Sequence, residues 1–204
     1  MMARLMNKGT KQRTISELEE VLAMMGASIN VSASNDAIVI SGNTLSRNFE
    51  STMDILYEML MEPRWDSTEF ETEKRNIINQ LSQVKSRPNS IATNEFRKIL
   101  YGNDHIFSTN ILGTESTVDD ITIDDLKAYY ENKLSPDLTS FHVAGAVSKE
   151  QVIKSMSLLA DKWKVKEVQF PDYQIPENLN DSKVYFYDVP GAKQSVLRFG
   201  YHGP

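Results

Sequence analysis

Apolar residues recur three to four positions apart in several segments of the chain, the spacing of helices that bury one face. The clearest of these segments begins at Thr14, which forms a capping-box pattern with Glu17, and it ends at Gly26. Other segments with this spacing begin at residues that commonly cap helices, such as Ser46 and Ser148. The pattern therefore predicts helices over residues 14–25, 46–62, 66–84, 90–101, 123–133 and 148–163.

Other segments alternate between apolar and polar residues, as strands do. Residues 27–33 and 37–42 alternate in this way and are separated by the turn residues 34–36, so they predict a β-hairpin with its apolar side chains on one face. Residues 139–146 are mostly apolar and predict a further strand. Helices and strands together indicate an α/β domain.

The pattern breaks down after residue 165, where prolines and asparagines replace periodic apolar residues. Two apolar segments follow, 184–189 and 195–201, and they predict two strands around Pro190 and Gly191. We therefore expect a domain over 1–165, a linker over 166–182 and the first strands of a following domain over 183–204. Residues 1–6 have the pattern of the middle of an amphipathic helix, so we also expect that the sequence begins inside a domain.

Composition excludes several classes of protein. The 204 residues include 22 Lys and Arg against 28 Asp and Glu, a net charge of −6, and the charges are scattered along the chain. This distribution argues against a nucleic-acid partner. The absence of cysteine excludes disulfides and thiolate metal sites. No apolar run approaches the roughly 20 residues that a membrane span needs.

Ionisable side chains provide few candidates for a chemical site. His105, His142 and His202 are far apart in the sequence, and we expect a loop or capping role for the first and a place within the sheet for the second. The acidic pairs 119–120 and 124–125 lack the spacing of a calcium loop, so we expect them to cap a helix. Methionines lie on helical stripes and are expected in the core; they are Met1, Met2, Met6, Met24, Met25, Met53, Met59 and Met61.

A series of short motifs along the chain is more specific than any of these residues alone. In chain order they are Lys8-Gly9-Thr10, Arg13-Thr14, Glu17-Leu18, Gly26-Ala27, Glu62-Pro63, Phe70-Glu71, Glu73-Lys74-Arg75, Tyr101-Gly102-Asn103-Asp104-His105, Gly113-Thr114, 121–126, Tyr129-Tyr130, Ser135-Pro136 and 142–147. Their order and spacing resemble the pitrilysin/insulinase family of zinc metallopeptidases. The resemblance implies an α+β fold, a mainly antiparallel sheet with helices packed on one face, which agrees with the local patterns.

In this family the active domain carries His-x-x-Glu-His on the helix before the Lys-Gly-Thr turn. The two histidines and a glutamate from a later helix bind zinc, and the glutamate between the histidines is the general base. By this resemblance the base position holds Ala3, the second histidine position holds Arg4, the distal glutamate position holds Gln80, and the first histidine position falls before Met1. Alanine and arginine are not zinc ligands, and glutamine offers only a neutral amide oxygen.

We therefore expect no catalytic residue and no metal ligand in this chain, and the sequence does not indicate which residues bind substrate. Glu73 matches a glutamate that supports the zinc site in active members. With no ligand to orient, it is expected to make an ordinary surface or helix-pair contact.

The resemblance also implies a role. Family members form a clam shell of four homologous domains around a chamber that one zinc site faces, in one chain or in two. The chain is thus expected to be a zinc-free domain that forms chamber wall, substrate-binding and assembly surface for a homologous catalytic domain or subunit, where the zinc lies. Unfolded peptides are the expected substrates of that assembly. The alternative is a purely structural scaffold module with no peptidase role. The compartment stays open between periplasm or cell envelope and cytoplasm.

Overall fold

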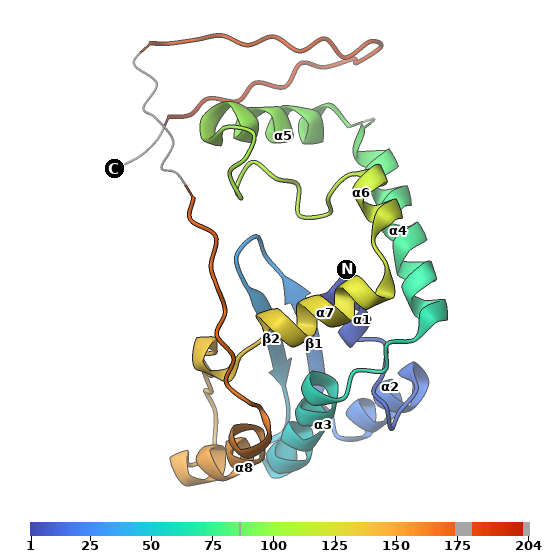
Figure 1. Ribbon diagram of the computed structural model, residues 1–204, viewed down its shortest axis with the longest axis vertical. Coiled ribbons are helices and arrows are strands. Elements are labelled where there is room, and N and C mark those ends of the chain that lie inside the picture. The colour runs from blue at the N-terminus through green and yellow to red at the C-terminus, as the bar shows by residue number, and fades with distance from the viewer. Residues whose placement is uncertain (86, 174–180, 202–204) are drawn as a thin grey trace. The chain divides into compact units, whose positions relative to one another are not determined.

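The computed structural model describes residues 1–85, 87–173 and 181–201 (Figure 1). The chain divides into two compact units. The first unit comprises residues 1–73 and 121–169, and the second comprises 74–120 and 170–204. Helix α4 (Ser67–Lys85) begins in the first unit and continues into the second. The boundaries expected at residues 165 and 183 separate homologous domains, whereas the two units are groups of residues that pack together. The expected boundaries therefore stay predictions.

The first unit holds most of the regular structure. Its elements are α1 (Met2–Met6), α2 (Ile15–Met24), β1 (Ser28–Ala33), β2 (Ile38–Asn43), η1 (Ser46–Asn48), α3 (Phe49–Met61), the start of α4, α7 (Ile123–Lys133), η2 (Pro136–Leu138) and α8 (Lys149–Lys162). The second unit holds the rest of α4 with α5 (Pro88–Tyr101) and α6 (Glu115–Asp120). The helices predicted from apolar spacing are therefore confirmed to within a few residues. No helix in the described part of the chain is long and apolar enough to span a membrane.

Local capping contacts explain why several helices begin where the sequence predicts. Thr14 and Glu17 form both halves of a capping box at the start of α2, and Thr122 and Asp125 do so at α7. At α8 the box joins Ser148 to Gln151. Each box pairs two backbone N–H groups that the first helical turn leaves without a partner. Asp125 of the acidic pair at 124–125 thus caps a helix, as expected, whereas the pair at 119–120 forms the exposed C-terminal end of α6 and makes no such cap.

The sheet has two antiparallel strands, β1 and β2, which are the paired arrows in Figure 1. Ser28 is paired with Asn43 at one end and Ala33 with Ile38 at the other. Val31 is buried opposite Ile40, and it lies on the same face of β1 as Ile29. The hairpin predicted for residues 27–42, with one apolar face, is confirmed, and so is the α+β class.

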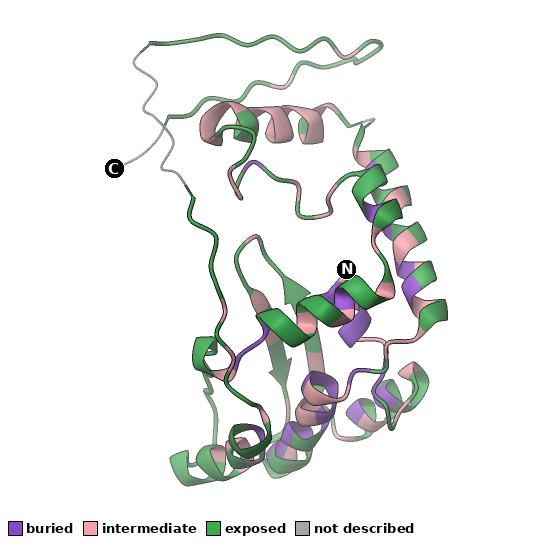
Figure 2. Ribbon diagram, in the orientation of Figure 1, coloured by how far each residue is buried: buried purple, intermediate pink, exposed green. Residues whose placement is uncertain are grey.

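A hydrophobic core lies in the first unit. Figure 2 shows buried residues on α1, α2 and α3, and the core also includes residues of β1, α4, α7 and α8. Its buried members are Met2, Ala3, Leu5, Met6, Leu18, Leu22, Val31, Ile55, Met59, Leu60, Phe70, Leu126, Leu134 and Leu159. The N-terminal segment is thus an integral part of this core.

Three expected strands are not formed. Among the described residues the sheet contains only β1 and β2, and the segments 139–146, 184–189 and 195–201 form no strand. Most of their apolar residues are exposed, and Val184 is 98% exposed. A segment becomes a strand only when its backbone pairs with a neighbour, and these segments have the sequence of strands without such a neighbour.

Candidate functional site

The positions that the family resemblance assigns to the general base and the second histidine lie on α1. Ala3 is 4% exposed, and its methyl group is part of the core. Asn7, which follows this helix in the chain, links it to β1. Its side-chain amide donates to the Val31 carbonyl and accepts from the Val31 N–H, both at 2.8 Å. A buried methyl group has no lone pair to bind zinc or a proton. The base position therefore has a packing role.

Arg4, at the second histidine position, faces a carboxylate of α4. Its Nη1 lies 3.6 Å from Oε2 of Glu73, and the Nζ of Lys8 lies 3.1 Å from Oε1 of the same group. Lys8 also lies 3.8 Å from Oε2 of Glu69. We call these four residues the Glu73 cluster. Glu73 itself is only 7% exposed, so it makes the helix-pair contact expected for it and is not a surface residue.

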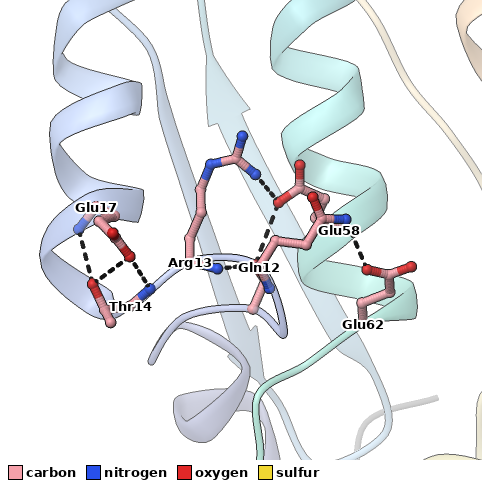
Figure 3. A network of polar contacts seen from close by, with 7 residues as sticks. Gln12, Arg13, Thr14, Glu17, Glu58 and Glu62 are labelled. Carbon is pink, nitrogen blue, oxygen red and sulfur yellow. Dashed lines mark hydrogen bonds and ion pairs between the residues drawn. The ribbon is translucent and has the colours of Figure 1, made fainter.

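The Lys8-Gly9-Thr10 turn is held on its other side by α3. The Thr10 hydroxyl donates to Oε2 of Glu58 at 3.3 Å and accepts from the N–H groups of Gln12 and Arg13. Arg13 forms an ion pair with the same Glu58 oxygen, and Gln12 donates to Glu62 (Figure 3). Thr10 is completely buried and Glu58 nearly so. Hydrogen bonds and opposite charge thus compensate the burial of Glu58.

The third family position, Gln80, lies on α4 in the second unit and is exposed. It follows Glu73 by seven residues, or two helical turns. The three family zinc-site positions that this sequence contains thus hold a methyl group, a guanidinium and a neutral amide. These groups do not fit a zinc ion, which takes imidazole, thiolate or carboxylate ligands. In the described residues no group of three or more histidines and acidic residues is arranged to hold a metal.

The two histidines in the described part of the chain, His105 and His142, belong to different units. His105 lies in a loop of the second unit, where its Nδ1 accepts from the Phe107 N–H at 3.2 Å and its ring stacks on Tyr101 at 5.2 Å between centroids. His142 was expected within the sheet, and this is wrong, because it lies exposed in the unpaired segment 139–146. His202 lies outside the described residues.

Groups with shifted pKa values serve helix caps and packing. Hydrogen bonds from backbone and side chain at Thr14 lower the pKa of Glu17, and backbone hydrogen bonds from Glu69 and Thr68 lower that of Asp66 at the start of α4. Burial raises the pKa of Tyr130 to about 12, and its hydroxyl donates to a carbonyl of α3. None of these groups occupies a catalytic position of the family.

Sequence reasoning missed Lys8 and Arg13 as charge partners. The acidic partners of both residues lie far along the chain, so local sequence patterns do not indicate them. One signal was available. Glu69 and Glu73 are four residues apart, a spacing that places two carboxylates on one face of a helix and favours cationic partners there.

The chain is similar in sequence to known peptidases. A family model for Insulinase (Peptidase family M16) matches residues 1–115, more than half of the 204 residues. The chain belongs to the insulinase family of peptidases. The uncharacterized zinc protease YmxG of Bacillus subtilis, a relative in this family, is 27% identical over 156 residues, which are 76% of this chain and 37% of that protein. Mitochondrial-processing peptidase subunit beta of Neurospora crassa is 27% identical over 156 residues, 76% and 32% of the two chains.

A solved structure shares the insulinase-family fold. The peptidase M16 inactive domain from Pseudomonas fluorescens superposes with a TM-score of 0.79 at 18% identity, and the match covers 87% of this chain and 43% of that one. At this identity the likeness concerns the fold alone. The chain spans about a third of the length of the two curated relatives.

Proposed function

We propose that this chain is a non-catalytic, zinc-free domain of an insulinase-family peptidase, and that it forms chamber wall, substrate-binding and assembly surface for a homologous catalytic domain or subunit. The observation that carries the proposal is the pair of residues on α1. Where an active domain has its base and second histidine, this chain has Ala3 in the core and Arg4 against Glu73.

The chemistry at these positions supports an inactive site. Metallopeptidase hydrolysis needs a metal-bound water and a base to take its proton. Ala3 cannot accept a proton, and Arg4 keeps a permanent positive charge that would repel a dication. A single amide oxygen such as that of Gln80 does not hold zinc on its own. The zinc of the working assembly is therefore assigned to the catalytic partner domain.

Incomplete coverage of the relatives supports a partner. The chain matches only 43% of the Pseudomonas fluorescens inactive-domain structure and 37% of the Bacillus subtilis zinc protease. We assign residues 1–165 to one family domain, 166–182 to a linker and 183–204 to the first strands of the next domain. The exposed apolar side chains of the extended segments 184–189 and 195–201 are consistent with pairing in such a neighbour. Unfolded peptides are the proposed substrates of the whole assembly.

A hydrolysis assay tests this function. The purified chain is incubated with an unstructured fluorogenic peptide, alone and together with the homologous polypeptide of the same source that carries His-x-x-Glu-His. We expect no metal-dependent cleavage by the chain alone. With the catalytic polypeptide present, adding this chain should raise the rate about 100-fold, the scale of effect that substrate positioning has.

Two results would contradict the proposal. Metal-dependent cleavage by the chain alone would show that it has its own active site. A catalytic polypeptide that binds the chain and cleaves equally fast with and without it would favour the scaffold alternative.

A further inference from the structure

Glu73 is a charged group inside the first unit, and both of its oxygens face cations from the α1 segment. Lys8 lies against Oε1 and Arg4 against Oε2, at 3.1 and 3.6 Å. The Glu73 side chain is 9% exposed, while those of Arg4 and Lys8 are 38% and 30% exposed. The carboxylate is therefore the buried partner, and the two cations extend from it toward solvent.

The four side chains of the Glu73 cluster carry equal numbers of positive and negative charges, and the Met1 ammonium group also interacts with Glu73 and Arg4. Arg4 and Lys8 contribute two positive charges, and Glu69 and Glu73 contribute two negative charges. Lys8 is shared between both carboxylates, so removing Arg4 would leave one net negative charge beside a buried group. A buried carboxylate is strongly unfavourable unless opposite charge or hydrogen bonds compensate it. Arg4 thus supplies one of the two side-chain cations that compensate these carboxylates, although Lys8 is closer to Glu73.

We propose that Arg4 and Lys8 are a built-in counter-cation for Glu73 that holds the α1 segment against α4 without a bound metal ion. The substitution that places arginine at the second histidine position removes a zinc ligand and adds a fixed positive charge at the same point of the fold. This inference rests on the contacts within the first unit. It holds whether or not the chain assists a catalytic partner.

Thermal unfolding of the full 204-residue chain tests the proposal through a double-mutant cycle. Arg4→Met and Lys8→Met are each expected to lower Tm by about 3–8 °C. In a Glu73→Gln background, where the buried charge is gone, the same two substitutions should have less than half that effect. Arg4→Lys keeps the charge and should stay within about 2 °C of the parent.

Lys127→Met is the matched control, because Lys127 pairs with Asp124 on an exposed helix face, and its Tm should change by less than about 2 °C. Excess EDTA and added ZnCl2 should both leave the Tm of the parent chain unchanged. Equal losses in the parent and Glu73→Gln backgrounds would overturn the proposal, because packing and not charge would then explain them. Failure of Arg4→Met to fold in both backgrounds, or a rise in Tm with zinc, would overturn it as well.

Discussion

Replacing Met59 by alanine is expected to lower the free energy of unfolding by about 2–5 kcal/mol. Met59 lies on α3 and is 1% exposed, and it belongs to the core of the first unit. Removing its side chain loses apolar burial and leaves a cavity that the surrounding helices fill only in part. Urea denaturation followed by fluorescence of Trp65 and Trp163, which pack against this core, measures the change.

Met24→Ala is the matched control for this prediction. Met24 is the last residue of α2 and is 74% exposed, so the same substitution should change the free energy of unfolding by less than about 0.5 kcal/mol. Equal effects at Met24 and Met59 would show that helix propensity and not packing determines both. The exposure of Met24 also corrects the expectation that it lies in the core.

Gly9→Ala is expected to destabilise the chain by more than about 3 kcal/mol. Gly9 has a φ of +98°, a conformation that L residues rarely adopt, and an added Cβ would lie 2.6 Å from the carbonyl oxygen of Arg13. That oxygen accepts from the Thr10 N–H, which closes the turn. The new methyl group therefore meets backbone that cannot move without opening the contacts to α3. Urea denaturation again measures the loss.

Gly26→Ala is the control that separates the cost of a positive φ from the cost of a collision between the added Cβ and backbone. Gly26 also has a positive φ, +59°, but its added Cβ would meet only the flexible end of the Leu45 side chain, at 3.3 Å. Its cost should be that of the left-handed conformation alone, about 1–2 kcal/mol. A loss at Gly9 no larger than the loss at Gly26 would refute the backbone collision.

Elements set by neighbouring residues could be predicted from the sequence, and elements that need distant partners could not. The helix that begins at Thr14 was predicted because its capping box lies within four residues. The hairpin of β1 and β2 was predicted because a short turn joins its strands. The segment 139–146 has the composition of a strand, but pairing needs a neighbour that its own sequence cannot specify.

The candidate site also has a part that the sequence predicts and a part that depends on distant contacts. Ala3 and Arg4 are identified by their distance from the Lys-Gly-Thr turn and Gln80 by its distance from Glu73, so these assignments need only the sequence and the family motif. The contact of Lys8 and Arg4 with Glu73 depends on how the α1 segment packs on α4, and burial of Glu73 follows from that packing. Sequence patterns alone therefore predict which residues stand at the family's zinc-site positions but not which contacts those residues make.

Zinc content is the measurement that tests the central claim most directly. The chain is purified without metal-chelate resin, incubated with excess ZnCl2, desalted and analysed by inductively coupled plasma mass spectrometry, beside a family member that carries His-x-x-Glu-His. We predict less than about 0.1 zinc per chain here, because a structural or catalytic zinc site needs three or four protein ligands. A value near one zinc per chain would contradict the assignment of this domain as zinc-free.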